Sequence, residues 1–194
     1  DGTRYTGSVG SDGKIHKDNL PEGECQIIFK QLTNAHWEVD QVNCGDEIRL
    51  LVDCPAHDEG DSVTFEIYKL FKEESGDAVT SVDGTVDSNS QAEAVWTYEY
   101  QEEDEGTSPR FIFKAKSGSL ETKSDVLTVV DVFEATLTDS DGNPVANAGY
   151  VITLPDGSQR EGVTNAEGQI VEEELPVGNL KVRMDDGSTL EQSS

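Results

Sequence analysis

Two short segments of the chain carry side chains of the kinds that bind metal ions. Cys-Pro-Ala-His at positions 54–57 offers a thiol and an imidazole, but no second Cys or His pair follows at the spacing of a zinc site. Asp-Ser-Asp-Gly-Asn at positions 139–143 offers oxygen ligands at the opening spacing of a calcium loop. Pro144 stands where that loop needs glycine, and no Glu closes the loop. Turns explain both segments, so we expect no metal and no cofactor.

Catalysis needs a nucleophile beside a base, paired carboxylates in a shielded cleft, or metal ligands. The three histidines, His16, His36 and His57, lie in no recognisable nucleophile motif. The acidic runs at 102–105 and 172–174 could attract cations weakly, but such runs are typical of solvated loops and strand edges. We therefore predict that the protein is not an enzyme. Convergent carboxylates with strongly shifted pKa values in a deep pocket would favour the opposite conclusion.

The two tryptophans, Trp37 and Trp96, could stack on sugar rings as aromatic side chains do in carbohydrate-binding sandwiches. Trp96 alternates with Ala94 and Tyr98 along a strand-like run. A tryptophan in such a run more often fills a core, so we assign both residues a structural role. Exposure of either ring would favour a glycan-binding module.

The composition limits the possible partners. The chain has 194 residues, with 40 Asp and Glu against 14 Lys and Arg, which gives a formal net charge of −26. It lacks the clustered basic residues that neutralise phosphates, so we exclude nucleic acid as a partner. No apolar run approaches the ~18 residues of a membrane span, so no membrane insertion is expected. Salt screens charge repulsion of this size, which fits a salty extracellular setting, and simple solubility explains the acidity equally well.

The three cysteines, Cys25, Cys44 and Cys54, leave at least one thiol unpaired within the chain. Cys44 and Cys54 flank an extended run, which holds them farther apart than the ~7 Å that a disulfide allows. Three reduced thiols are the favoured interpretation, while a bond from Cys25 to either of the others stays open. A disulfide-stabilised scaffold is excluded.

The sequence repeats itself at a spacing of 155 residues, because residues 1–29 align without a gap onto residues 156–184. The identities fall at turn signals, and the last apolar positions of both copies alternate as in a strand packed on one face. We interpret this as one fold used twice. The glycines and prolines to which we assign structural roles are Gly7, Gly13, Pro21 and Gly23 in the first copy and Gly162, Gly168, Pro176 and Gly178 in the second.

The second copy is the more complete one. Residues 132–155 precede it with an alternating apolar run, a turn and a second strand-like run from Tyr150 to Leu154. The first copy lacks these two strands, and a three-strand remnant would leave an unpaired edge and an uncovered apolar face. We therefore expect the chain to be a segment of a longer protein, or to receive the strands from a neighbouring copy.

The region between the copies consists of at least five strand-like runs separated by acidic or Gly-rich loops. About a hundred residues with strands at this spacing predict an antiparallel sandwich. Residues 66–74 also fit helical spacing, and we predict a strand there.

Two sets of motifs resemble known modules. The first comprises positions 139–144, Tyr150, Asp156-Gly157, Gly162, Gly168 and Leu-Pro-Val-Gly at 175–178. It resembles the transthyretin-like module of the carboxypeptidase-regulatory type, in the form appended to bacterial type VI secretion spike (VgrG) proteins. The second comprises Ala-His-Trp at 35–37 and the runs 45–50 and 60–67. It is similar to the immunoglobulin-like domains that accompany those modules.

We therefore predict an all-β protein of tandem small β-sandwiches. Residues 1–30 would be a partial transthyretin-like repeat with its C-terminal strands only, 31–131 an immunoglobulin-like sandwich, 132–185 a complete transthyretin-like sandwich and 186–194 a polar tail. The resemblance implies non-catalytic structural modules of a secreted or extracellular bacterial assembly, with a type VI-like spike extension as the specific form. The expected partners are other protein subunits or neighbouring copies of the chain, docked at sandwich edges. The alternative is a cell-surface adhesin or glycan-binding module.

Overall fold

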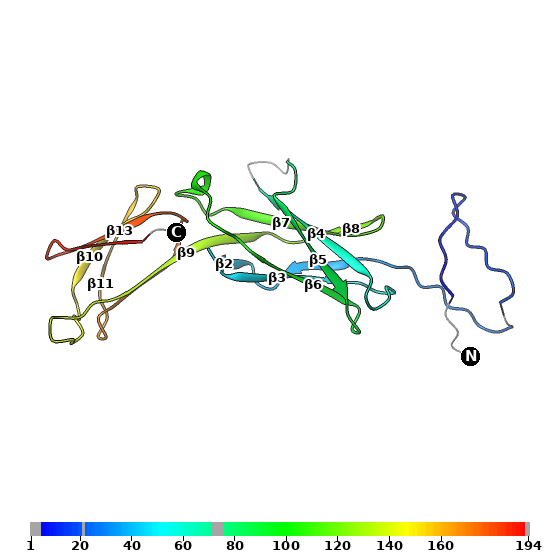
Figure 1. The fold of residues 1–194 in the computed structure, drawn as a ribbon, viewed down its shortest axis with the longest axis horizontal. Helices are drawn as coiled ribbons and strands as arrows, with labels where there is room; N and C mark the ends of the chain where they lie inside the picture. Colours follow the sequence, from blue (N-terminus) through cyan, green and yellow to red (C-terminus); the bar gives the residue numbers. More distant parts are fainter. Residues whose placement is uncertain (1–4, 21, 71–75, 193–194) are drawn as a thin grey trace.

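The computed structural model describes residues 5–20, 22–70 and 76–192 and confirms the all-β class. Two sandwiches lie end to end, and an extended segment leads into the first of them (Figure 1). In the described residues, no helix has the length and apolar character needed to cross a bilayer. The elements are β1 Thr33–Trp37, β2 Gln41–Asn43, β3 Glu47–Asp53, β4 Ser62–Lys69, β5 Thr80–Val86, β6 Gln91–Thr97, η1 Glu102–Asp104 (a 3-10 turn), β7 Arg110–Ser117, β8 Leu120–Lys123, β9 Leu127–Thr136, β10 Gly149–Thr153, β11 Gln159–Val163, β12 Gln169–Leu175, β13 Leu180–Met184 and β14 Thr189–Gln192.

The first sandwich has an immunoglobulin-like arrangement. One layer contains β1, β3 and β6, and the other contains β4, β7 and β9, with β2 parallel to β9. Strand β5 pairs with both β4 and β6, so it connects the two layers. Inward residues alternate with outward ones along β3 and β4, as the period of two requires. Strand β4 ends at Lys69, which confirms the first part of the strand predicted over 66–74; positions 71–75 lie outside the described residues.

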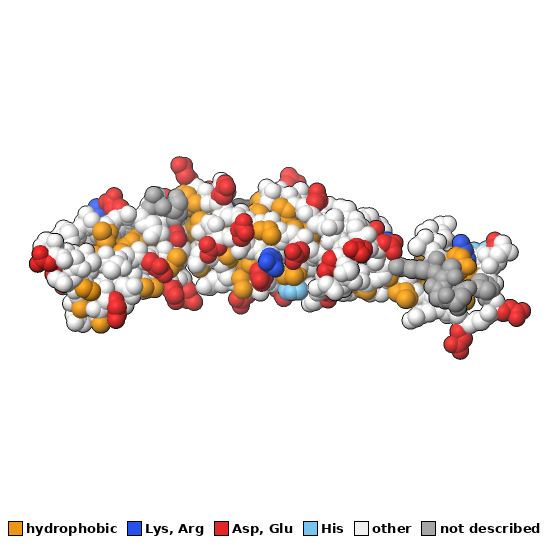
Figure 2. All heavy atoms as spheres, turned by 60° about the horizontal axis from the view of Figure 1, so that its bottom comes forward, with side chains coloured by type: hydrophobic (Ala, Val, Ile, Leu, Met, Phe, Trp, Pro, Cys, Tyr) orange, Lys and Arg blue, Asp and Glu red, His pale blue; other side chains and the backbone are white. Residues whose placement is uncertain are grey.

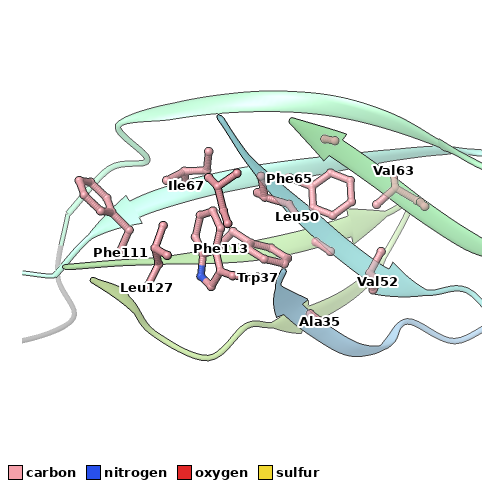
Figure 3. Packing of buried hydrophobic residues seen from close by; sticks show 14 of the residues in the cluster. Ala35, Trp37, Leu50, Val52, Val63, Phe65, Ile67, Phe111, Phe113 and Leu127 are labelled. Carbon is pink, nitrogen blue, oxygen red and sulfur yellow. The ribbon is translucent and has the colours of Figure 1, made fainter. Parts of the chain in front are cut away.

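The core of the first sandwich is built around aromatic rings (Figure 3). Trp37 is buried, and its ring centroid lies 5.0 Å from that of Phe113 in an edge-on contact and 5.8 Å from that of Trp96. The indole N–H of Trp37 donates a hydrogen bond to the carbonyl of Asp125 at 3.1 Å. Trp96 is half-buried and packs against the same cluster. Both rings therefore contribute packing area at the centre of the sandwich.

The second sandwich has a four-stranded sheet in the order β11-β10-β13-β14 and a two-stranded layer of β9 and β12. Its separate core includes Phe133, Ile152, Ile170 and Val182. The polar tail predicted over 186–194 is wrong, because residues 189–192 form β14 against β13. Leu190 lies between the polar residues Thr189 and Glu191 and packs against the core, which gives that strand an apolar contact despite its polar composition.

Strand β9 belongs to both sandwiches. Its first half pairs with β2 and β7, and its second half pairs with β12. The boundary predicted between residues 131 and 132 therefore falls inside a continuous strand, which Figure 1 shows running from one sandwich into the other.

The described residues before Leu32 form no strand, and all of them are exposed. The strands expected in the partial repeat are thus not formed, because a strand needs a partner for its ladder and no described strand pairs with this segment. Pro21 lies outside the described residues.

Candidate interaction sites

The side chains singled out for metal chemistry do not converge. Among the described residues, no group of three or more His, Cys, Asp or Glu is placed to hold a metal ion. Cys25, Cys44 and Cys54 are free thiols, and burial is the first cause that raises the pKa of both Cys44 and Cys54. A raised pKa keeps a thiol protonated, which opposes both nucleophilic attack and metal binding. His57, three residues after Cys54, is buried. Neither of its ring nitrogens has a hydrogen-bond partner.

The calcium-like run at 139–143 is a closed turn. The Asp139 carboxylate accepts hydrogen bonds from the backbone N–H groups of Asp141 and Asn143, each at 2.9 Å. The Asn143 side chain also donates to it, and these bonds lower the pKa of Asp139. The carboxylate that would bind a cation is therefore directed at its own backbone, as in an ordinary Asx turn.

Two surface depressions on the first sandwich contain several carboxylates. One lies beside β2 and the start of β3, and the other lies across β5 and β6. Asp87 lines the second depression, where the backbone N–H of Gln91 and the side chain of Asn89 donate to it and lower its pKa. A general acid needs a raised pKa at neutral pH, so Asp87 is tuned in the opposite direction.

A buried ion pair lies near the junction of the two sandwiches. The Lys69 ammonium, at the end of β4, lies 2.5 Å from the Asp104 carboxylate, and the two side chains are 8% and 6% exposed. Tyr98 donates a hydrogen bond to the other Asp104 oxygen at 2.6 Å. Burial opposes the charge on Lys69, but Asp104 and Glu103 outweigh it and raise the pKa of that ammonium. Burial and the bond to Asp104 likewise raise the pKa of Tyr98. The pair thus fixes η1 in one position.

The residues that follow η1 contact the second sandwich. The Gly106 N–H donates to the Val177 carbonyl at 2.9 Å, and the Val177 N–H donates to the Thr107 carbonyl at 2.8 Å. The Val177 side chain is fully buried and belongs to the core of the first sandwich. The Asn179 amide donates to Glu105 at 3.4 Å. A loop of the second sandwich is therefore inserted into the first, so the two units share an interface as well as strand β9.

The glycines predicted to be structural have different surroundings in the two copies. A Cβ on Gly162 would lie 2.3 Å from the Tyr150 ring, and a Cβ on Gly168 would lie 2.5 Å from the Leu137 carbonyl oxygen. Gly178 packs against Pro155 and Glu105, next to Pro176 and Val177 in the loop between β12 and β13. In the first copy, a Cβ on Gly7, Gly13 or Gly23 would meet nothing within 4 Å.

Sequence reasoning missed the junction. The Lys69–Asp104 pair joins residues 35 positions apart, and no local pattern marks it. One signal was available: Val177 stands opposite Glu22 in the repeat, so an apolar residue in the second copy replaces a charged one in the first. That difference is typical of a position buried in only one of two copies.

Carboxylates are the most numerous charged groups on the visible surface. Figure 2 shows acidic side chains spread over both sandwiches, with few Lys or Arg among them. Several of the basic groups are in exposed ion pairs, such as Lys181 with Glu191 at 2.9 Å. Exposed pairs of this kind contribute little to stability. Because the chain has 40 Asp and Glu against 14 Lys and Arg, most of its negative charge is not compensated by basic residues.

Comparisons with known proteins give likenesses at a low level. No protein-family profile matches the chain, and no curated protein matches it. The solved TIE protein of Bacillus anthracis is 14% identical with a TM-score of 0.38, over 89% of this chain and 39% of that one. The chain thus spans well under half of the TIE protein. BcpA, the major pilin subunit of Bacillus cereus, is 14% identical with a TM-score of 0.25, over 96% of this chain and 70% of that one. Likenesses this low carry no conclusion about function.

Proposed function

We propose that the protein is a non-catalytic structural and interaction module of a secreted or extracellular bacterial assembly. The observation that carries the proposal is the passage of β9 through both sandwiches. Domains joined by a loop move relative to one another by default. Here both halves of one strand are held in ladders, and the Val177 loop is inserted beside it. The chain therefore acts as a rigid spacer that presents its surfaces at a fixed distance.

The electrostatics support a non-catalytic role. The carboxylates of Asp61, Glu66, Asp87 and Asp139 all have lowered pKa values, each chiefly because of a hydrogen bond to the ionised form. Such groups stay ionised at neutral pH and cannot donate a proton in a general-acid step. Lys30, in the segment before β1, is the partner of Asp61, and Lys116 on the paired strand β7 is the partner of Glu66. The partners of Asp87 and Asp139 lie in their own turns.

Docking of protein subunits would use the free sheet edges. Strands β11 and β14 end the four-stranded sheet, and each pairs on one side only among the described strands. An edge of this kind can accept a further strand, with backbone hydrogen bonds giving affinity and alternating side chains giving selectivity. The sequence resemblance supports an extension of a type VI-like spike as the specific assembly. The glycan-binding alternative loses its main support, because Trp37 is buried in the core of the first sandwich and the half-buried Trp96 packs against that core.

The proposal is tested by measuring whether the two sandwiches tumble as one rigid body. Insertion of Gly-Ser-Gly between Asp131 and Val132 would interrupt β9, and the same insertion between Gly118 and Ser119 in the β7–β8 turn is the control. Backbone 15N relaxation should give one rotational correlation time for both sandwiches in the unmodified chain and in the control. The β9 insertion should give two shorter times. Independent tumbling of the sandwiches in the unmodified chain would contradict the proposal.

A further inference from the structure

One ladder of the first sandwich differs from the others that the described residues form. Strand β2 pairs with β9 in parallel, whereas every other described pair of strands is antiparallel. The Thr128 N–H donates to the Asp40 carbonyl at 2.9 Å, and the Cys44 N–H donates to the Val130 carbonyl at 2.7 Å. These bonds lie at the two ends of the ladder, whose bonds are evenly spaced as in any parallel pair. The ladder therefore joins the strand that follows β1 to the last strand of the first sandwich.

Strands β2 and β9 both point toward the second sandwich. The chain enters the first sandwich at the end remote from the second, and β9 leaves it at the other end (Figure 1). The entering segment contacts the sandwich at once, because the Gln31 N–H donates to the Pro55 carbonyl at 3.2 Å. Strand β1 follows and leads into β2. A pull on both ends of the molecule therefore draws β2 toward the entry end and β9 toward the second sandwich.

Such a pull loads the β2–β9 ladder in shear. The two strands are drawn in opposite directions along their common axis, so the bonds between them share the load and must break together. A ladder that is pulled apart from one end opens one bond at a time, and each single bond contributes little. Survival under force is set by the rate of unfolding, so the direction in which a ladder is loaded matters as well as its total stability.

Side chains fix this ladder to the core of the first sandwich. Trp37, at the end of β1, is buried, and its indole N–H donates to the carbonyl of Asp125, two residues before β9, at 3.1 Å. Val129, in the paired part of β9, is fully buried, and Val42 opposite it packs against the same core. The core thus covers the ladder and limits the access of water to its bonds, which strengthens them.

The rest of β9 continues the same path into the second sandwich. It pairs with β12 from Thr136, opposite Gln169, to Asp131, opposite Leu175. A pull on the far end of β9 loads this second ladder along its length as well. Force applied at the far end of the second sandwich therefore reaches β2 through one continuous strand, with no loop between the two sandwiches along this path.

We propose that the chain carries tension along its long axis, and that the parallel β2–β9 ladder is the latch that resists it. The partners are two bodies of an assembly, one of which pulls on the segment before β1 and the other on the second sandwich. The ladder resists their separation, while β9 transmits the force without a flexible joint. This proposal rests on the rigid-spacer function proposed above and specifies what the rigidity serves.

The test measures how long the first sandwich survives at a fixed force in optical tweezers, with the full chain pulled in two directions. For axial pulling, one attachment tag precedes Asp1 and the other is inserted between Asp141 and Gly142, in the exposed turn after β9. For transverse pulling, the tags are inserted in the turns at 88–89 and 118–119, which connect β5 to β6 and β7 to β8. The axial pull loads the latch in shear, and the transverse pull separates the two layers from one end.

The lifetime under axial pulling should exceed the lifetime under transverse pulling at the same force by at least about tenfold, because several bonds must break together in shear. A smaller ratio would overturn the proposal. Because the comparison uses the unmodified sequence apart from the tags, it does not depend on the folding of a variant.

Two variants assign the resistance to the latch itself. Thr128→Pro removes the N–H that is donated to Asp40, and it should shorten the axial lifetime on the order of tenfold while the transverse lifetime changes much less. The control is Val63→Ala on β4, which removes buried packing outside the latch and should shorten both lifetimes by similar factors. An effect of Thr128→Pro that is equal in both directions would reflect general stability and would contradict the assignment.

The tumbling of the two sandwiches needs no applied force, so it is measured independently of the lifetimes. Common tumbling together with a lifetime ratio below about tenfold would reject the latch and leave the rigid-spacer proposal standing. Independent tumbling would reject the rigid spacer, and the transmission of force with it.

Discussion

Residues 14–20 and residues 169–175 have related sequences, yet only the latter form a strand. Both stretches follow a turn with a glycine of positive φ, and each ends at a leucine that a proline follows. The residue before that leucine also has a positive φ in both copies, although it is Asn19 in the first and Glu174 in the second. The difference lies outside them, because β12 pairs with β9, whereas no strand among the described residues pairs with 14–20. Local sequence thus sets the backbone path and the turn positions, while a distant segment decides whether a strand forms.

The largest difference in stability effect between the copies should appear at Val177, the residue at the junction, and its counterpart Glu22. Val177→Glu gives the second copy the residue of the first and places a charge in the core of the first sandwich. We expect a loss of more than about 4 kcal/mol in the free energy of unfolding, because burial of an unpaired charge is among the most destabilising changes. The reciprocal Glu22→Val should change it by less than about 0.5 kcal/mol, since Glu22 is exposed. Urea denaturation measures both, and equal effects would contradict the comparison.

The apolar strand positions should give the next largest difference. Ile170 is 1% exposed, so Ile170→Ala leaves a cavity and should cost about 2–5 kcal/mol. Ile15 is 45% exposed, and Ile15→Ala should stay within about 0.5 kcal/mol. The measurement is the urea midpoint followed by tryptophan fluorescence and by far-UV circular dichroism. A cost for Ile15→Ala similar to that for Ile170→Ala would show that the first copy is already packed.

The counterpart glycines Gly162 and Gly7 should show a smaller difference in the effect of substitution on stability. Gly162→Ala would place a methyl group against the Tyr150 ring, which is held by its hydrogen bond to Glu172 at 2.7 Å. Overpacking of this kind should cost about 1–3 kcal/mol. Gly7→Ala meets open space and should be neutral or slightly stabilising, by up to about 1 kcal/mol, because it restricts the unfolded chain. Thermal unfolding of the two variants checks this, and a destabilising Gly7→Ala would indicate an unseen contact.

The smallest expected effect is on the pH dependence of stability, at Tyr150. Burial first, and then the bond to Glu172, raises the pKa of Tyr150 to about 12. A group whose pKa is raised on folding stabilises the native state fully below its unfolded value of about 10, and this contribution is lost as the pH rises from about 10 to about 12. Tyr150→Phe should therefore cost about 1 kcal/mol at pH 7 and should lose less stability than the wild type between pH 10 and 12. Parallel stability curves over that interval would disagree with this expectation.

The features that depend on residues a few positions apart were predicted correctly from the sequence, and those that depend on distant strands were not. Alternation and turn residues within a few positions were enough to predict a sandwich in the first unit, antiparallel except for the β2–β9 pair, and the strand that ends at Lys69. The polar tail was mispredicted because Leu190 has an apolar role only beside β13. The strands of the first copy were mispredicted for the opposite reason: their apolar pattern resembles that of the second copy, but no described strand pairs with them.

The residues of the candidate interaction sites divide in the same way. The repeat itself singled out Gly7, Gly13 and Gly23, since a gapless alignment needs no structure. The Lys69–Asp104 pair and the insertion of Val177 could not be predicted, because they depend on how loops from separate sandwiches meet.

The amino-acid sequence by itself determined the strand period, the turns, the acidic surface and the two copies of one backbone path, because these depend on side-chain type and on neighbours within a few residues. Only the tertiary structure decided that β9 serves two sandwiches, that residues 189–192 form a strand, and that the described residues 5–20 and 22–29 form none. Each of these outcomes is a matter of pairing, and a hydrogen-bonded ladder exists only where two distant segments meet in register.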